Sequence, residues 1–348
     1  YFTPLPDREI VSEGKRYLHF SGTSYLGMGS QPEFRQVLID SILKHGPNHG
    51  SSRNSNVQLP IYDTFEAYFA AGSGAEAAAL LSSGFMAGQL ALNTLRPLVD
   101  LTWTAPDTHP AITYESQPQS DLSHQQWQKR CIAKSKKLLG QKVLLLSNAV
   151  NPLIPEIHDF EWTKKLSPAN KYYLLVDDSH AFGILGKGLF GTYAQWKNLP
   201  VELMVCGSLG KGLALPAGII LGSQPLIDKV RENAVYRTSS PPAPAFLNAF
   251  LEGQDIYQSQ QQKLSKNLHY MLSAVSQLEE FKMLPQYPVI SFAPEHWVDK
   301  LHEKGFALSS FPYPFPASPP VNRIILSAWH LPTDLEALVG AIGEIINC

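Results

Sequence analysis

Short apolar runs alternate with stretches of helical periodicity through the first two thirds of the chain. Apolar runs of this length are typical of buried strands, and apolar residues three or four positions apart are typical of helices packed on a core. The pattern predicts strands at Tyr17–Phe20, Leu98–Thr104, Lys142–Ser147, Tyr172–Val176, Val201–Cys206 and Ile219–Leu221. It predicts helices over Glu33–Lys44 and Pro60–Ala71, a helix that runs to about Leu95, and helices that begin at Glu161–Lys165 and near Pro225.

The character of the chain changes near Pro244, where helices with polar faces begin. The sequence then predicts, in order, a strand at Pro288–Phe292, a helix near Val298–Lys304, a proline-rich loop at Phe311–Pro320 and a strand at Val321–Ser327. A last helix begins near Thr333, a residue type suited to an N-cap. We therefore expect three parts: an N-terminal segment over 1–45, a large domain over 46–240 and a small α+β domain over 241–348.

The composition is that of an ordinary globular protein, with 44% hydrophobic residues, 17% charged residues and a formal net charge of −2. This balance gives no electrostatic reason to bind nucleic acid or an anionic membrane, and no long apolar run predicts a membrane-spanning helix. Cys131, Cys206 and Cys348 are far apart and form no CxxC motif. The pattern fits a reducing compartment without a disulfide framework or zinc site, so we expect a cytoplasmic protein without a metal.

Two of the predicted strands lead into residues that can carry chemistry. The strand at Tyr172–Val176 is followed by Asp177, and the carboxyl ends of strands are where open α/β sheets bind ligands. The strand at Val201–Cys206 leads into Lys211, which two glycines flank. Burial beside a core would lower the pKa of this lysine and free its amine to act as nucleophile or base. A solvent-exposed loop lysine is the alternative, and the glycine spacing does not match a phosphate-binding Gly-x4-Gly-Lys-Ser/Thr loop.

The order strand, aspartate, strand, lysine is the one that enzymes dependent on pyridoxal phosphate (PLP) use. VDDSHAFGILGKGLFG, from Val176, and GSLGKGLALPAG, from Gly207, resemble VDDAHGxGxxGxxGxG and GTLGKAxGxxGG of the α-oxoamine synthases. This family of fold-type I PLP enzymes includes 8-amino-7-oxononanoate synthase and serine palmitoyltransferase. The resemblance runs from about Phe20 to Leu338. It implies an α/β fold-type I transferase with a mostly parallel central sheet flanked by helices and a smaller α+β C-terminal domain.

The resemblance also implies which residues surround the cofactor ring. Lys211 would hold the PLP aldehyde as a Schiff base, and Asp177 would keep the pyridine nitrogen protonated so that the ring accepts electrons. His180 would hydrogen-bond the side of the ring that carries the hydroxyl. His109, in a segment similar to DxxNHAS, would stack on the ring face.

Residues from three segments would hold the phosphate. LSSGFMAG, from Leu81, resembles SSGYxAN, where backbone N–H groups at a helix N-terminus bind the phosphate; Gly88 stands where the family has asparagine. NAVYRTSSPP, from Asn233, resembles FSTSLPP, whose threonine reaches the phosphate of the other subunit. The residues implied are Gly84, Phe85, Met86, Ser208 and Thr238. Without the family, an ordinary turn is the better interpretation of each of these two segments.

The implied substrate site departs from the family in two places. Arg323, in RIILSAWH, resembles the arginine of RxxxSAxH, which pairs with the amino-acid carboxylate through two parallel hydrogen bonds. Thr23 falls where the family asparagine helps to hold that carboxylate. The family turn FSMDGDxAPL is missing after the strand at Lys142–Ser147, so no serine can be carried over, and whether Asn151 substitutes for it stays open.

The reaction implied is the condensation of an amino acid with an acyl thioester, on CoA or acyl carrier protein, with decarboxylation to an α-amino ketone. Lys211 would remove the α-proton. The enzyme would be a homodimer with its active site at the interface. With alanine and a pimeloyl thioester, this reaction is the biotin-precursor step of 8-amino-7-oxononanoate synthase.

Three other interpretations stay open. The missing turn and Thr23 favour an aminotransferase or lyase that acts on a small amino acid with PLP. Asp177, Asp178 and His180 would suit a metal hydrolase. A non-catalytic partner subunit is the third, although the presence of Lys211 weighs against it.

Overall fold

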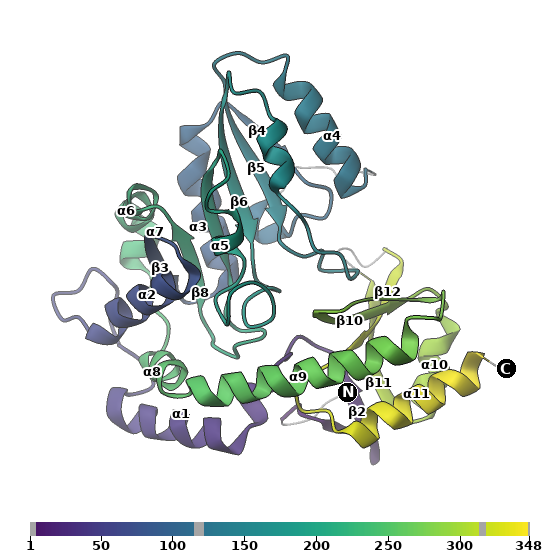
Figure 1. The fold of residues 1–348 in the computed structure, drawn as a ribbon. Helices are drawn as coiled ribbons and strands as arrows, with labels where there is room; N and C mark the ends of the chain where they lie inside the picture. The colour runs from purple at the N-terminus through teal and green to yellow at the C-terminus, as the bar shows by residue number, and fades with distance from the viewer. Residues whose placement is uncertain (1–4, 115–121, 313–317, 347–348) are drawn as a thin grey trace.

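The structure is a computed structural model that describes residues 5–114, 122–312 and 318–346. Within these residues, the strands form two separate six-stranded sheets. Figure 1 shows the larger body, with β4, β5 and β6, above the long helix α9 (Gln254–Val275), and the second sheet beside the C-terminal helix α11 (Pro332–Ile346). No helix in the described ranges is both long and apolar enough to cross a membrane.

The first sheet has the strand order β3-β8-β7-β6-β5-β4. Its strands are β3 (Ala77–Leu81), β4 (Leu101–Thr104), β5 (Lys142–Asn148), β6 (Lys171–Asp177), β7 (Glu202–Ser208) and β8 (Gly218–Gly222). Strands β4 to β7 are parallel, whereas β8 pairs antiparallel with both β7 and β3. The expected α/β fold with a mostly parallel central sheet is confirmed, and the four parallel strands all end at one edge.

Both faces of this sheet are covered, and alternate residues of each strand serve the two faces. In β5, Val143 and Leu145 join the cluster with Phe65 of α2, whereas Leu144 and Leu146 join the cluster with Leu90 of α3. Helices α3 and α4 accordingly lie on opposite sides of the sheet in Figure 1. Burial on both faces explains why the strands are continuous apolar runs rather than alternating ones. The covering and connecting helices of this body are α2 (Pro60–Ser73), α3 (Gly84–Leu95), α4 (His124–Ser135), α5 (Tyr193–Trp196), α6 (Gln224–Glu232) and α7 (Ala234–Thr238).

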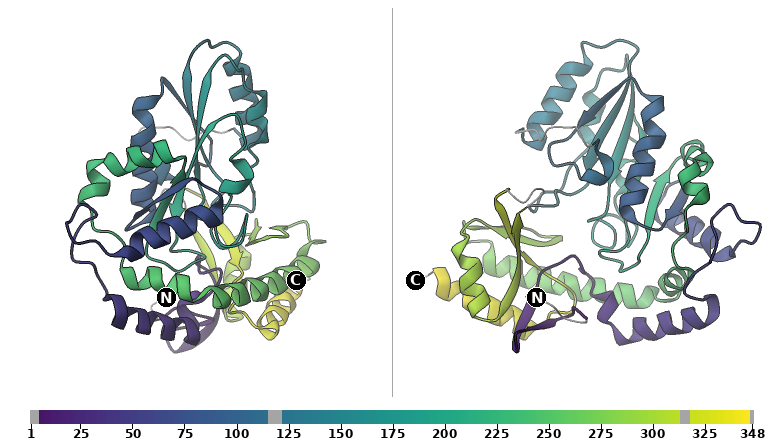
Figure 2. Two further views of the ribbon diagram at one scale, coloured as in Figure 1. Left: turned by 60° about the vertical axis from the view of Figure 1, so that its left-hand side comes forward. Right: turned by 180° about the vertical axis from the view of Figure 1, so that it is seen from behind.

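The second sheet has the order β1-β2-β11-β12-β10-β9 and joins the two ends of the chain. Its strands are β1 (Glu9–Ser12), β2 (Lys15–Phe20), β9 (Phe281–Leu284), β10 (Tyr287–Phe292), β11 (Phe306–Pro312) and β12 (Pro320–Ile325). Strand β2 pairs parallel with β11, and Figure 2 shows the N-terminal strands beside the C-terminal ones. The remaining helices are α1 (Pro32–His45), α8 (Pro244–Glu252) and α10 (His296–Glu303). The domain boundaries at 45 and 240 stay a prediction.

Helix α9 connects the two bodies through buried hydrogen bonds. Tyr257 donates its hydroxyl to the Leu213 carbonyl at 2.7 Å, in the loop between β7 and β8. Gln260 donates to the Leu26 carbonyl, and Asn267 donates to the carbonyls of Ser327 and His330. One helix therefore holds the lysine loop, the segment after β2 and the segment after β12 in fixed relation.

Several elements differ from the sequence prediction. Strands β1, β9 and β11 have no counterpart in it, and the helix expected at Glu161 is a 3₁₀ turn, η4 (Glu161–Lys165). The strand expected from Leu98 begins at Leu101, because the 3₁₀ helix η2 (Arg96–Leu98) continues α3. Helix α11 begins at Pro332, and Asp334 rather than Thr333 accepts the Leu331 N–H at its start. Part of the proline-rich loop, 313–317, lies outside the described residues.

A buried carboxylate, Glu66, ties α2 to the edge of the first sheet. It is 3% exposed, and it accepts hydrogen bonds from the Leu80 N–H of β3 and from the Tyr236 hydroxyl of α7. It also pairs with Arg231 at 3.0 Å and with Arg53 at 3.4 Å. Burial raises the pKa of Glu66, and the two guanidinium groups oppose that rise. The carboxylate therefore depends on partners from four separate segments.

Replacing Glu66 with alanine should lower the free energy of unfolding by about 3–5 kcal/mol, because two cations would lose their buried counter-charge. Asp63→Ala is the matched control: Asp63 pairs with the same Arg53, but its side chain is 81% exposed. Asp63→Ala should lower the free energy of unfolding by less than about 1 kcal/mol. Urea unfolding followed by circular dichroism measures both, and equal losses would show that the buried network has no special role.

Candidate active site

Asp177 ends strand β6 at the edge where the parallel strands terminate. It lies between Asn148 of β5 and Cys206 of β7 in register, and it is 6% exposed. Its Oδ1 accepts the Ser179 N–H at 2.8 Å. Its Oδ2 lies 3.8 Å from Nδ1 of His109. The carboxylate is therefore fixed through one oxygen while the other faces the site.

The loop that carries Lys211 packs directly against the segment after Asp177. A Cβ on Gly207 would lie 2.7 Å from the Ser179 backbone nitrogen, and a Cβ on Gly212 would lie 2.5 Å from the Phe182 carbonyl oxygen. Both contacts are closer than any side chain permits, so the glycines on either side of Lys211 allow two backbones to touch. The glycine-broken loop predicted from the sequence is confirmed as the connection between β7 and β8.

This packing places the Lys211 amine in a buried, electrostatically defined position. Burial lowers the pKa of Lys211, and the charge of Asp177 partly opposes that change. A lowered pKa means that a larger fraction of the amine is neutral near pH 7, which is the form that attacks a carbonyl or accepts a proton. The alternative of a solvated loop lysine does not fit this environment.

His180 and Tyr25 form a pair that joins the two bodies. The Tyr25 hydroxyl and His180 Nδ1 are 2.8 Å apart, and Tyr25 is 1% exposed. Burial, the charge of Lys211 and then other cations including Arg323 hold the pKa of His180 well below its ordinary value. Burial also raises the pKa of Tyr25 to about 12. Both groups are therefore neutral, and they offer hydrogen bonds rather than charge.

His109 sits in the turn after β4, beside Asp177. Its N–H donates to Asn148 Oδ1 at 3.0 Å, and its Nδ1 accepts the Ala111 N–H. Burial lowers the pKa of His109, and Asp177 opposes that change. Its imidazole is thus neutral, partly exposed and held next to the carboxylate, which suits contact with an aromatic ring.

The N-terminus of α3 packs on the same loop. A Cβ on Gly84 would lie 2.4 Å from the Ser208 Cα, so only glycine fits there. Ser83 is the N-cap, and its Oγ accepts the Met86 N–H. The first N–H groups of a helix have no partner within the helix. In α3 these are the N–H groups of Gly84 and Phe85. Of the three implied phosphate donors, Met86 is thus already used by the cap.

Arg323 reaches the site from β12 of the second sheet. Its Nη1 donates to the Pro152 carbonyl at 2.6 Å, and its guanidinium lies over the Phe311 ring. Its charge contributes to the lowered pKa of His180, which places it within electrostatic range of the Lys211 cluster. Thr23 lies in the turn that leads to Tyr25, and its carbonyl accepts the Tyr25 N–H.

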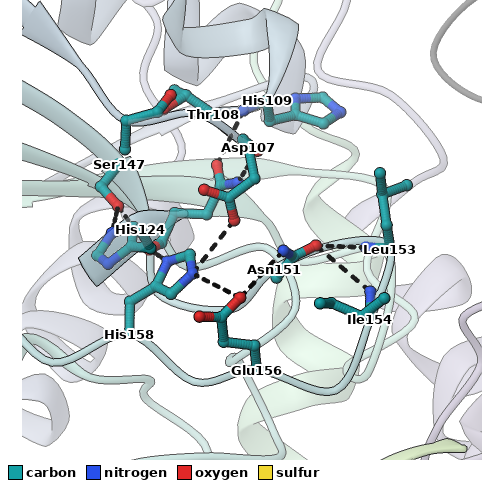
Figure 3. A network of polar contacts seen from close by, with 12 residues as sticks. Asp107, Thr108, His109, His124, Ser147, Asn151, Leu153, Ile154, Glu156 and His158 are labelled. Atoms are coloured by element: carbon teal, nitrogen blue, oxygen red, sulfur yellow. Dashed lines mark hydrogen bonds and ion pairs between the residues drawn. The ribbon is translucent and has the colours of Figure 1, made fainter. Parts of the chain in front are cut away.

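Two predicted residues lie apart from this cluster. Thr238 is exposed at the end of α7, where its hydroxyl donates to the Ala234 carbonyl; among the described residues, no hydrogen bond or ion pair joins it to Lys211 or Ser208. Asn151 uses its side-chain oxygen to accept the N–H groups of Leu153 and Ile154 (Figure 3). Asn151 therefore shapes its own loop.

The geometry does not favour the metal-hydrolase interpretation. Asp178 is fully buried, and its two oxygens accept the N–H and the hydroxyl of Thr192 at 2.6 and 2.8 Å. Burial raises its pKa to about 7. Asp178 is thus directed into the protein, away from a common centre with Asp177 and His180.

Sequence reasoning missed three groups that this site uses: Tyr25, Asn148 and the Pro152 carbonyl. Tyr25 lies two residues after the predicted site residue Thr23, in SGTSYLG from Ser21, and this closeness could have indicated it. Asn148 ends β5 next to Asp177, and its position as a polar residue at a strand end could have indicated it too. No sequence signal points to a backbone carbonyl.

Comparison with known proteins agrees with this geometry. The family model for aminotransferases of class I and II matches residues 109–342, which is more than half of the chain. The chain belongs to this family. The chain is therefore a PLP-dependent transferase.

Among individual relatives, the chain is 27% identical to the 8-amino-7-oxononanoate synthase of Aliivibrio fischeri over 97% of this chain and 91% of that protein. It is 25% identical to the serine palmitoyltransferase of Bacteriovorax stolpii over 83% of this chain and 72% of that protein. Both relatives are α-oxoamine synthases, so the resemblance found in the motifs is confirmed.

Solved structures support the same fold. A serine palmitoyltransferase variant from S. paucimobilis with bound PLP–myriocin superposes with a TM-score of 0.81 at 17% identity and covers 97% of this chain and 89% of its own. The 8-amino-7-oxononanoate synthase of Francisella tularensis superposes with a TM-score of 0.72 at 18% identity and covers 95% and 98%. The fold-type I architecture is thereby confirmed.

The residues present fit PLP. Its aldehyde needs an amine, which Lys211 supplies from a buried position beside a carboxylate. Its pyridine nitrogen needs that carboxylate, Asp177, and its phosphate needs free N–H groups, which the start of α3 offers. The individual site assignments stay predictions.

Substituting Gly84 with alanine in this PLP-dependent transferase should separate α3 from Ser208. We expect a loss of about 1–3 kcal/mol in unfolding free energy, because an added methyl group overlaps fixed backbone. The affinity for PLP should fall as well, since the helix N-terminus moves. Gly340→Ala is the control: Gly340 lies inside α11 with no atom within 4 Å of its added Cβ. That change should be neutral or stabilise slightly, and a matching effect of both changes would contradict the packing argument.

Proposed function

We propose that this protein is an α-oxoamine synthase that condenses an amino acid with an acyl thioester, with loss of the carboxylate, to give an α-amino ketone. The observation that carries the proposal is the meeting of Lys211, Asp177, His109 and His180 at one strand edge, with Arg323 within electrostatic range from the second sheet. The two relatives with this type of activity in their names, aligned over most of the chain, support it. The acyl carrier would be CoA or acyl carrier protein.

The roles follow from charge and position. When bound, PLP supplies an electron sink for the electrons left by a departing proton or carboxylate. Lys211 would hold the cofactor aldehyde, and its amine would serve as the base for the α-proton of the substrate. Asp177 would keep the pyridine nitrogen protonated, and His109 would cover the ring face. His180, held neutral beside Tyr25, would donate a hydrogen bond to the cofactor without adding charge.

Arg323 orients the amino acid through its carboxylate. In this structure its Nη1 donates a hydrogen bond to the Pro152 carbonyl of the 149–157 loop. The substrate carboxylate would replace that carbonyl as the acceptor. A charge-assisted bidentate pair is stronger than a bond to a neutral carbonyl. Entry of the amino acid would therefore release the loop from Arg323.

We further propose a homodimer in which the exposed Thr238 of one subunit serves the phosphate of the other. The free, buried thiols of Cys131 and Cys206 support a cytoplasmic location. The specific reaction of 8-amino-7-oxononanoate synthase, with alanine and a pimeloyl thioester, is the first to test.

The second candidate is an aminotransferase acting on a small amino acid. It is favoured by the short 149–157 loop, which lacks the family turn, and by Thr23 at the family asparagine position. Both features change the wall of the substrate site without changing the residues around Lys211.

Purified protein supplied with PLP should gain a visible absorption band that shifts when alanine is added. Alanine with pimeloyl-CoA should then release free CoA, measured with a thiol reagent. Lys211→Ala should lower that rate by about 10²–10⁴-fold or more, because both the cofactor anchor and the base are lost. Lys229→Ala, an exposed lysine of α6, should leave the rate unchanged. Formation of a keto acid without CoA release would instead establish the aminotransferase.

Arg323→Ala should raise KM for the amino acid by about 10–100-fold, the loss expected for a charge-assisted pair. KM for the acyl thioester should change little, because that substrate does not use the arginine. Arg16→Ala, on the same sheet with its side chain 80% exposed, provides the control. Equal increases in the two KM values would remove Arg323 from the role of carboxylate partner.

A further inference from the structure

A cluster of ionisable side chains lies behind His109 and has no role in the proposed reaction. It contains Asp107 from the turn after β4, His124 from the start of α4, and Glu156 and His158 from the loop after β5 (Figure 3). The side chain of His158 is 1% exposed, that of Asp107 is 12% exposed and that of Glu156 is 43% exposed. Buried ionisable groups are costly unless they are paired, so the cluster needs a physical explanation.

His158 is at the centre of the cluster. Its Nδ1 bonds to the Asn148 carbonyl at 2.8 Å, and as a donor it fixes the ring orientation. Its Nε2 lies 3.2 Å from Asp107 Oδ2 and 3.8 Å from Glu156 Oε2. Among the described residues, neither oxygen of Asp107 accepts a regular hydrogen bond. The carboxylate of Asp107 therefore has the His158 ring as its charge partner.

The second imidazole, His124, stacks on the first. The ring centroids are 3.7 Å apart and the planes differ by 7°. Burial, followed by the charge of His158, lowers the pKa of His124 to about 3. Its Nε2 pairs with Ser147 Oγ and its Nδ1 with the Gln128 amide. Hence His124 is neutral with both nitrogens in use, and His158 is the ring that can carry a proton.

A protonated His158 fits better than a bound metal. Ligand atoms of Asp107, His124 and His158 do lie within 4.8 Å of one another. However, zinc binds an imidazole nitrogen in the ring plane at about 2.0–2.1 Å, and two parallel rings stacked face to face cannot both direct a lone pair at one ion. Burial lowers the pKa of His158, but the carboxylates of Glu156 and Asp107 outweigh it and raise the value above the ordinary one.

The cluster is connected to His109 through Asn148. The side chain of Asn148 accepts the His109 N–H at 3.0 Å and donates to the Asp107 carbonyl at 2.6 Å. His158 bonds to the backbone of Asn148 and pairs with the side chain of Asp107. Three contacts of the turn that presents His109 therefore depend on Asn148 or His158, in addition to the bonds from Thr108 and Ala105 to the Leu146 carbonyl.

We propose that His158 is a positioning residue: as a cation between Asp107 and Glu156, it fixes the turn that presents His109 to the cofactor. The role rests on the proposed function, because His109 faces PLP only if PLP binds. The bond from His158 to the Asn148 carbonyl holds the two ends of this loop together, and the bridge from His158 to Asp107 ties the loop to the turn of His109. Proton loss from His158 as the pH rises through its raised pKa removes the bridge, so the stabilisation exists below that pKa.

The first test does not require the cofactor. We expect His158→Asn to keep the bond to the Asn148 carbonyl but to lose the bridge to Asp107. Hydrogen exchange of the His109 backbone amide, followed by NMR, should then accelerate about tenfold, because the turn opens locally more often. His296→Asn changes an exposed histidine of α10 and should leave that rate unaltered. Unchanged exchange in the His158 variant would overturn the positioning role, whatever the enzyme's activity.

The second test uses PLP affinity in a double-mutant cycle. His158→Asn should weaken PLP binding about tenfold in the wild-type background. In the His109→Ala background the same change should weaken binding less than about twofold, because the effects of residues that act through one another are not additive. Independent, additive losses would reduce His158 to a general stabilising role. If His158→Asn accelerates the exchange of the His109 amide but the wild-type protein takes up no PLP, the positioning role stands and the proposed function is refuted instead.

Metal analysis completes the design. Protein purified without chelator should contain no stoichiometric zinc, and the NMR titration of His158 should show its pKa above 6.5 in the wild type. One equivalent of zinc that disappears in the His158→Asn variant would replace the protonated bridge with a metal site and overturn the inference.

Discussion

Close contact between backbones at the carboxyl ends of β6 and β7 is the constraint on which the rest of this structure depends. Gly207 and Gly212 bring the Lys211 loop onto Ser179 and Phe182 with no room for a side chain. Gly84 brings the start of α3 onto Ser208 in the same way. These contacts bury the lysine beside Asp177 and point a helix N-terminus at the same place. An amine, a carboxylate and a set of helix N-terminal N–H groups are thereby assembled from segments that share no local sequence pattern.

The charge distribution of the site follows from burial. His109 and His180 are kept neutral because burial and neighbouring cations lower their pKa values. Arg323 then supplies a positive charge and Asp177 a negative charge, whereas burial lowers the pKa of the Lys211 amine. This division suits a cofactor with a phosphate, a protonatable ring nitrogen and an aldehyde. The pKa of His158, which lies outside the site and between two carboxylates, is shifted in the opposite direction.

The loop from Asn148 to His158 connects the two halves of the site. At one end Asn148 holds the turn of His109, and in its middle the Pro152 carbonyl accepts a hydrogen bond from Arg323 of the second sheet. The loop thus contacts both the first body, through His109, and the second sheet, through Arg323. A change in this loop can therefore alter both the turn that carries His109 and the position of Arg323.

The sequence alone determined the elements whose cause is local. Strands buried on both faces are continuous apolar runs, so β5, β6 and β7 could be predicted to within a few residues, and so could helices such as α1 and α2. The glycines and the order of Asp177 and Lys211 were also visible, because close packing and a strand end restrict residue type at single positions. Those features, together with the motif resemblance, were sufficient to predict the fold and the cofactor.

Only the tertiary structure decided which distant groups meet. Tyr25 and His180 are 155 positions apart, and Arg323 and Pro152 are 171 positions apart. Strand β11 was not predicted because its partner β2 lies at the other end of the chain. The side chains of His124 and His158 look like surface histidines in the sequence and stack only when α4 closes over β5. Such pairings depend on packing and on shared burial between remote segments, which no local pattern of polar and apolar residues encodes.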